Sequence, residues 1–161
     1  MSVLERLNAA GAPSSLVERA SRDGEATFSV DPSEAHALLS TLKAACGFET
    51  VSFLTAVDRS PAADRFEVTW MLRSERHCDR VRVTTRVPEG AARVRSVTDL
   101  WPGAAFMERE CYDMFGIDFE GHEDLKRLLM PEGYGHHPLR KEFPHHGIEP
   151  DRLYREWERS R

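Results

Sequence analysis

Alternation of apolar and polar residues in the middle of the chain constrains its fold more than any other feature. Every second side chain in residues 65–73 is apolar, and residues 79–87 place valines at one parity and arginines at the other. Successive side chains of a strand point to opposite faces, so both segments predict strands with one apolar face. Short polar links, at 59–64 and 74–77, favour antiparallel pairing. The apolar set is Phe66, Val68, Trp70, Leu72, Val81, Val83 and Val87.

More strands are predicted on either side of this pattern. Residues 50–57 are largely apolar and predict a strand in the centre of the same sheet. Residues 16–20 and 26–30 flank a polar turn at 22–24 and predict a hairpin. We therefore expect a mostly antiparallel sheet with one buried face and one face that is solvated or covered by another element.

Two helices are predicted in the first half of the chain. Ser2 and Glu5 have the spacing of a capping box, and Gly11 marks the end of this short helix. Residues 31–34 (D-P-S-E) combine an N-cap, a proline at the first helical position and an acidic first turn, and Gly47 closes the helix that follows. The inward-facing side chains would be Leu4 and Leu7 in the first helix and Leu38, Leu39, Leu42 and Ala45 in the second.

Residues 106–117 (F-M-E-R-E-C-Y-D-M-F-G-I) predict a third helix that ends at Gly116, where a left-handed cap suits glycine. A start signal at 96–99, interrupted by Pro102, predicts that helical structure begins upstream. Each residue rotates about 100° around the helix, which separates an apolar from a charged side. Glu108 falls at the apolar margin, where an unpartnered carboxylate is costly. The apolar side comprises Met107, Cys111, Met114 and Phe115, and the charged side Arg109, Glu110 and Asp113.

The character of the chain changes from residue 118. Residues 124–130 predict at most one helical turn, and residues 131–150 are too rich in proline and glycine for a regular element. Large apolar residues in that stretch predict an extended arm that lies on another surface, followed by a short helix at 151–161. The apolar residues are Tyr134, Leu139, Phe143 and Ile148 in the arm and Leu153, Tyr154 and Trp157 in the terminal helix.

The predicted fold class is α+β, with helices packed on one face of a mostly antiparallel sheet and followed by an extended C-terminal arm. Residues 1–117 would form the globular domain, and residues 118–161 would be an arm and short terminal helix that dock on partner subunits. The 161 residues suffice for a real core.

Composition narrows the classes of function. The net charge of −5 argues against a nucleic-acid-binding surface, and no apolar run approaches the roughly 20 residues of a membrane span. Glu5 and Arg6 interrupt the N-terminal residues, so we expect no secretory signal and a cytoplasmic chain held at a membrane only through partners. The arginine-lined strand face at 79–87 is interpreted as solvated, with a partner surface as the alternative.

Neither the cysteines nor the histidines have the spacing of a metal site. Three widely separated cysteines fit neither a disulfide framework nor an iron–sulfur or zinc site, and we expect buried free thiols. The histidine pairs at 136–137 and 145–146 lack a completing carboxylate or thiol, so polar contacts within the arm are the preferred interpretation. The cysteines are Cys46, Cys78 and Cys111.

Acidic residues on the third helix suggest two kinds of chemistry. Glu108, Glu110 and Asp113 could supply a general acid and base, and repulsion between Glu110 and Asp113 would raise one pKa unless an arginine lies between them. An Arg109–Asp113 ion pair at i,i+4 is the structural alternative. No nucleophile set, phosphate loop or dinucleotide fingerprint accompanies these residues. A buried charge network at an interface is therefore favoured over a stand-alone acid–base enzyme that uses Glu108 or Asp113.

Three ordered blocks resemble one known family. They are E-R-E-C-Y-D-M-F-G-I at 108–117, F-E-G-H-E-D-L-K-R-L-L-M-P at 119–131 and H-P-L-R-K-E-F-P at 137–144. The family is the C subunit of bacterial NADH-quinone oxidoreductase, respiratory complex I, whose mitochondrial counterpart is the iron–sulfur protein subunit of thirty kilodaltons. The first hundred residues match only in length and element order. Glu123 stands where proline is common, and Glu142-Phe143 where Asp-Tyr is usual.

The resemblance implies a non-catalytic structural subunit in the peripheral arm of the complex, on the cytoplasmic side of the bacterial cell membrane. It implies no cofactor or metal in this chain, with FMN and iron–sulfur clusters in neighbouring subunits, and access to NADH and quinone only through the complex. The C-terminal arm would wrap the D subunit, near the B and I subunits. The related branch of membrane-bound hydrogenase-type complexes shares these blocks. The implied partner-interface residues are Glu108, Arg109, Glu110, Asp113, Phe115, His122, Arg127, Pro138, Leu139, Arg140 and Lys141.

Overall fold

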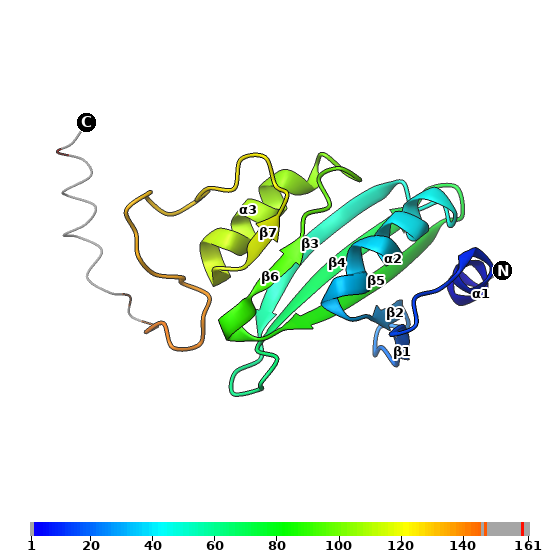
Figure 1. The fold of residues 1–161 in the computed structure, drawn as a ribbon, viewed down its shortest axis with the longest axis horizontal. Helices are drawn as coiled ribbons and strands as arrows, with labels where there is room; N and C mark the ends of the chain where they lie inside the picture. The colour runs from blue at the N-terminus through cyan, green and yellow to red at the C-terminus, as the bar shows by residue number, and fades with distance from the viewer. Residues whose placement is uncertain (1, 146, 148–158, 160–161) are drawn as a thin grey trace.

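A computed structural model describes residues 2–145, 147 and 159 (Figure 1). Within them, a five-stranded sheet has the order β1-β2-β5-β4-β3, and β6 and β7 form a second, two-stranded sheet. The arm residue Ile148 and the terminal helix predicted at 151–161 lie outside the described residues, except for residue 159. The described architecture is α+β, as predicted.

The alternating segments form the predicted strands. β4 (Phe66–Ser74) pairs antiparallel with β3 (Thr50–Asp58) on one side and β5 (Asp79–Val87) on the other. Trp70 lies between Leu54 and Val83 on the buried face, and all three are within the core. This confirms the prediction that the alternating segments are strands with one buried face and one open face.

β3 lies at an edge of the sheet, not in its centre as the sequence predicted. β2 (Ala26–Ser29) pairs parallel with β5 and so occupies the position beside it. Helix α3 (Ala104–Phe115) packs against β3, in which Val51, Leu54 and Ala56 are buried and Phe53 is exposed. An apolar run cannot by itself distinguish cover by a strand from cover by a helix.

The N-terminal elements follow their local signals. β1 (Val17–Arg19) and β2 form the predicted hairpin. Helix α1 (Val3–Ala10) begins with the Ser2–Glu5 capping box and ends at a left-handed Gly11; its Leu7 is buried and Leu4 is half-buried.

Helix α2 (Pro32–Ala44) begins after Asp31, although the Asp31 side chain makes no capping hydrogen bond. Its leucines at 38, 39 and 42 are fully buried, as predicted. Ala45 is exposed, contrary to expectation, because the chain leaves the helix there and Cys46 enters the core instead.

Two local predictions fail between the sheet and the arm. Residues 96–103 form turns, not a helix, and residues 124–130 contain no helical turn. β6 (Arg93–Arg95) and β7 (Asp118–Glu120) pair in parallel, a contact with no sequence signal. Residues 118–120, placed in the predicted arm, therefore pair with a strand of the first domain.

The cysteines are free, and two of the three are buried as expected. Cys78 is exposed at the turn between β4 and β5, where its φ of 53° places the backbone in the left-handed region. A turn residue beyond the ends of two strands has no core beside it. In the described part of the chain, no helix is long and apolar enough to cross a membrane.

Candidate partner-binding site at the end of helix α3

Helix α3 carries much of the predicted site and has the predicted end. Gly116 caps it with φ 74° and ψ 33°, and its N–H donates to the Tyr112 carbonyl. Cys111, Met114 and Phe115 are buried against the domain. The helix therefore presents its remaining face to the segment that follows it.

Asp113 is fully buried, although the sequence placed it on the charged side of the helix. Its Oδ2 accepts three successive backbone N–H groups, from Leu128 at 3.0 Å, Leu129 at 2.7 Å and Met130 at 2.9 Å. Its Oδ1 accepts from Arg127 Nη1 at 2.7 Å. The chain wraps around the carboxylate, which explains why these N–H groups form no helical turn.

The pKa of Asp113 reflects two opposing effects. Burial raises it, but the hydrogen bonds from Met130, Leu129, Arg127 and Leu128 together outweigh burial, so the pKa lies below its usual value. The carboxylate is therefore ionised at neutral pH. The Arg109–Asp113 ion pair, which was the structural alternative, does not form, because Arg109 donates instead to the backbone carbonyls of Lys126 at 3.2 Å and Arg127 at 3.0 Å.

The C-terminal carbonyls of α3 are satisfied by the arm. His137 Nδ1 donates to the Asp113 carbonyl at 2.9 Å, and the Leu139 N–H donates to the Met114 carbonyl at 3.1 Å. Arg140 Nε donates to the Phe115 carbonyl at 2.7 Å. The last turn of a helix leaves its carbonyls unpaired and carries a partial negative charge, so an arginine there is favourable.

The close contact between arm and helix depends on Gly116. A Cβ on this residue would lie 2.6 Å from His137 Nε2 and 2.7 Å from Arg140 Nη2. Burial lowers the pKa of His137, which therefore stays neutral in this contact. Glycine thus serves both the helix cap and the packing of the arm.

A second carboxylate holds the arm next to the end of α3. Asp58, at the end of β3, accepts from Arg65 Nε at 3.0 Å and Nη2 at 2.7 Å, and from the Lys141 N–H at 2.8 Å. Lys141 Nζ also donates to the Ser60 carbonyl. Arg65 further pairs with Glu142 in the arm. The hydrogen bond from Arg65 holds the pKa of Asp58 well below its usual range.

Sequence reasoning missed Asp58 and Arg65, and it expected His137 to make polar contacts within the arm, whereas His137 bonds to α3. Lys141 lies 83 residues from Asp58 along the chain. The available signal was the charge of Asp58 at the end of an apolar strand, and a strand end beside a turn is an ordinary place for aspartate.

Glu108 finds its partners inside the chain. It is fully buried, and its carboxylate accepts from the Val97 N–H at 2.8 Å and from Ser96 Oγ at 2.7 Å. Burial raises the pKa of Glu108 above its usual value despite these two bonds. The predicted need for a partner is thus met by the turn that precedes the helix, and not by a neighbouring chain.

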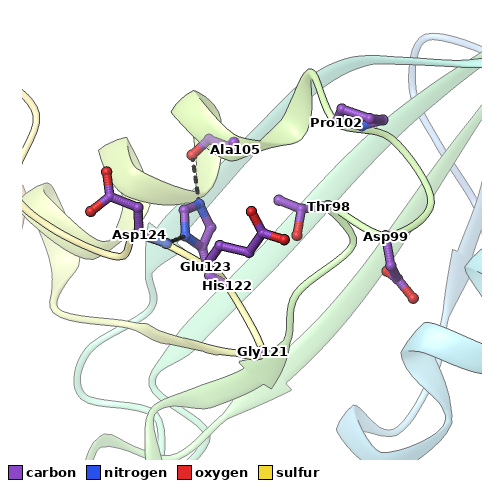
Figure 2. Close-up of a pocket in the computed structure, with 8 residues that line it drawn as sticks. All are labelled: Thr98, Asp99, Pro102, Ala105, Gly121, His122, Glu123 and Asp124. Atoms are coloured by element: carbon purple, nitrogen blue, oxygen red, sulfur yellow. Dashed lines mark hydrogen bonds between the residues drawn. The ribbon is translucent and has the colours of Figure 1, made fainter.

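A cleft of about 410 Å³ lies beside the other end of α3 (Figure 2). His122 lines this cleft: its Nε2 donates to the Ala105 carbonyl at 3.1 Å, and its Nδ1 accepts from the Asp124 N–H at 3.0 Å. Glu108 does not line it, and neither Glu108 nor Asp113 reaches solvent. Neither carboxylate can therefore reach a substrate as a general acid or base. The cleft residues are Thr98, Asp99, Pro102, Ala105, Gly121, His122, Glu123 and Asp124.

The predicted interface residues divide by exposure. Glu108, Asp113 and Phe115 are buried within this chain, which leaves these side chains no surface for direct contact with a partner. Within the described residues, no group of three or more histidine, cysteine, aspartate or glutamate side chains is placed to hold a metal. Direct partner contact stays a prediction for the rest: Glu110, Leu139 and Lys141 are exposed, and Arg109, His122, Arg127, Pro138 and Arg140 are half-buried.

Comparison with known sequences identifies relatives over most of the chain. Residues 28–149 match the family described as "Respiratory-chain NADH dehydrogenase, 30 Kd subunit". The chain is 44% identical over 131 residues to the C subunit of NADH-quinone oxidoreductase from Methylobacterium sp., covering 80% of this chain and 60% of that protein. It is 46% identical over 122 residues to NADH dehydrogenase [ubiquinone] iron-sulfur protein 3 of Candida albicans, covering 74% and 43%. The chain thus spans about half the length of the curated relatives it matches.

A longer relative and two solved structures are also similar. The second C/D subunit of NADH-quinone oxidoreductase from Aquifex aeolicus is 46% identical over 95 residues, which are 59% of this chain and 16% of that protein. A trypsin-resistant fragment of Nqo5 has a TM-score of 0.66 at 33% identity, covering 76% of this chain and 96% of the fragment. A chain of an archaeal membrane-bound sulfane sulfur reductase has a TM-score of 0.74 at 26% identity, covering 97% and 89%.

Proposed function

The chain belongs to the 30-kDa subunit family of respiratory-chain NADH dehydrogenase, and we propose on this basis that it is a structural subunit in the peripheral arm of a bacterial NADH-quinone oxidoreductase. The complex as a whole would transfer electrons from NADH to quinone and translocate protons. One observation carries this proposal: the family match runs from β2 through α3 and the arm to residue 149.

The chain itself would hold no redox centre, with FMN and iron–sulfur clusters in neighbouring subunits. Two observations support this. The three cysteines are free and lie on different parts of the fold, after α2, between β4 and β5 and in α3, whereas an iron–sulfur cluster is typically held by four cysteine thiolates. The acidic groups that suggested catalysis, Glu108 and Asp113, are fully buried and hydrogen-bonded.

The partners would be the D subunit and, near it, the B and I subunits, at the cytoplasmic side of the cell membrane. The relative from Aquifex aeolicus supports the D subunit, because its name joins the letters C and D in one protein. The surface offered to them would be the exposed side of α3 and the arm, including Leu139 and Lys141.

Co-purification from membranes tests the function. A tagged chain, solubilised in mild detergent, should bring down flavin- and cluster-containing subunits together with NADH-driven quinone reduction. A chain that purifies alone from membranes known to reduce quinone with NADH would contradict the proposal.

The archaeal sulfane sulfur reductase favours a second candidate, the equivalent subunit of a related membrane-bound respiratory or hydrogenase-type complex. It matches 97% of this chain at 26% identity. The same experiment separates the candidates, since such a complex would co-purify with cluster subunits but without NADH oxidation.

A further inference from the structure

We propose that Glu108 is a proton-binding switch, which exchanges its proton with the cleft of Figure 2 through the hydroxyl groups of Ser96 and Thr98 and sets the direction in which both hydroxyl groups donate. The protonation of the carboxylate would then follow the pH of the cleft, although no part of Glu108 reaches solvent. The switch consists of contacts within this chain, so it does not depend on which complex the chain belongs to.

A continuous chain of hydrogen bonds leads from the buried carboxylate to the cleft. Ser96 Oγ donates to Glu108 Oε2 at 2.7 Å and lies 2.8 Å from Thr98 Oγ1. Ser96 is buried, whereas Thr98 is half-buried and lines the cleft. Two hydroxyl groups therefore connect a carboxylate that has no solvent access to a surface that has it.

Both hydroxyl groups can reverse, because each can donate or accept a hydrogen bond. An ionised Glu108 only accepts, so Ser96 donates to Glu108 and Thr98 donates to Ser96. A protonated Glu108 donates to Ser96 Oγ, Ser96 then donates to Thr98, and the Thr98 hydroxyl donates into the cleft. Thr98 thus offers lone pairs to the cleft in one state and a proton in the other.

Proton uptake along this chain is balanced at every step. A proton from solvent binds Thr98 Oγ1, the Thr98 proton passes to Ser96 Oγ, and the Ser96 proton passes to Glu108 Oε2. Each hydroxyl group gains one proton and loses one, so only the carboxylate is protonated in the end. The other carboxylate oxygen, Oε1, accepts from the Val97 N–H at 2.8 Å in both states.

The surroundings of Glu108 bring its protonation to a higher pH than that of an exposed glutamate. Burial raises the pKa of Glu108, and its two hydrogen bonds offset this only in part. Of the charged groups that face it from neighbouring elements, His122 after β7 lowers the pKa and Asp99 in the turn before α3 raises it. On α3 itself, burial also raises the pKa of Cys111, which therefore stays a neutral thiol.

Carbon-13 NMR of the full-length chain tests the path of the proton. The Cδ signal of Glu108 should titrate with a midpoint above 4.5, and relaxation dispersion at that midpoint measures the rate of proton exchange. Thr98→Val removes the hydroxyl group at the cleft and should slow the exchange at least about tenfold. Thr98→Ser keeps the hydroxyl group and is the matched control, which should exchange as fast as the wild type. Equal rates in the two variants would overturn the path.

The reversal of the hydroxyl groups has a separate signature. The Cβ signals of Ser96 and Thr98 should shift with the same midpoint as Glu108 Cδ. Glu108→Gln should abolish this shift, and any pH dependence that is left then belongs to His122 or the acidic residues of the cleft. An unchanged shift in Glu108→Gln would overturn the reversal. If Glu108→Gln does not fold, different midpoints for the three wild-type signals would still overturn it.

Discussion

Two carboxylates on one helix have opposite pKa shifts, and their donors explain why. Asp113 receives three backbone N–H groups and a guanidinium, whereas Glu108 receives one N–H and one hydroxyl. Both are fully buried. Four donors with a cation outweigh the cost of burying a negative charge, and two neutral donors do not.

Substitution of Glu108 should distinguish hydrogen bonding from charge. Glu108→Gln keeps an acceptor for the Val97 N–H and should cost less than about 1 kcal/mol of unfolding free energy. Glu108→Ala leaves Ser96 and Val97 without an acceptor beside a cavity, and should cost about 2–4 kcal/mol. Urea unfolding of both variants measures this; equal losses would contradict it.

The same variants make a pH prediction. Because the folded-state pKa of Glu108 is raised above the ordinary value of 4.5, folding favours its protonated form. Wild-type stability should fall relative to Glu108→Gln as pH rises from 4.5 through the raised pKa. The unfolding free energies of the two proteins should be measured at several pH values across this range. A difference between them that does not change with pH would contradict the prediction.

Gly116 should be less replaceable than a glycine with the same φ. Gly24 and Gly116 both have φ of 74°, but a Cβ at Gly24 meets nothing within 4 Å. Gly24→Ala should cost about 1 kcal/mol for the left-handed backbone alone. Gly116→Ala must also displace His137 and Arg140, so we expect an additional loss of about 1–2 kcal/mol. Thermal unfolding of the two variants measures their losses of stability. Similar losses would show that the arm moves away from residue 116 without a cost in stability.

At the scale of elements, the end of β3 acts as an anchor for the arm. Asp58 and Arg65 form a nearly buried pair, and the arm adds Lys141 and Glu142 to it. An edge strand has a neighbouring strand on one side only, so a later segment of the chain can pack beside its end. The edge position of β3, which the sequence did not predict, is thus what makes this anchor accessible.

Removal of one partner from this pair should be costly. Arg65→Met leaves Asp58 buried without its cation and should destabilise the fold by about 3–5 kcal/mol. Arg86→Met is the control, because its pair with Glu67 is on the open face and Arg86 is 49% exposed. That variant should lose less than about 1 kcal/mol. Denaturant unfolding checks the contrast, and comparable losses would count against a buried anchor.

Acid should release the strip of residues 126–141. The folded-state pKa values of Asp58 and Asp113 lie below the ordinary value of 3.8, so their stabilising effect is complete above that pH. It is lost as pH falls below 3.8 through the lowered values. Amide protection at 128–130 and 141 should therefore decline below about pH 4. Protection that persists undiminished at about pH 1 would contradict this.

At the scale of the whole molecule, the domain and the first part of the arm form one packed unit. The described arm bonds to α3 and to the end of β3, elements that lie at one end of the sheet in Figure 1.

Assembly should depend on Arg140 more than on Arg82. Arg140 donates to the Phe115 carbonyl and holds the arm against α3, whereas Arg82 pairs with Asp23 on the open sheet face. Arg140→Ala should therefore lower the amount of assembled complex several-fold, and Arg82→Ala should leave it near wild type. Native gels of membranes from the two strains measure this, and equal amounts would refute it.

Local signals in the sequence were enough for the strands at 50–87, the capped helices and the glycine that ends α3. Each depends on residues within one or two turns of chain, where periodicity and capping act directly. The acidic and basic residues of α3 were recognised as a network, but their partners were not. These partners lie outside the helix and contact it only because the chain folds back against it. They are Ser96, Arg127 and Leu128–Met130.

Only the tertiary structure decided the edge position of β3, the pairing of β6 with β7 and the burial of Asp113. Asp58 and Lys141 are 83 residues apart, and no local pattern records such a contact. A carboxylate has the same sequence signature whether it faces water or a ring of backbone N–H groups. Which of these it faces depends on the path of a segment without regular structure, and packing alone determines that path.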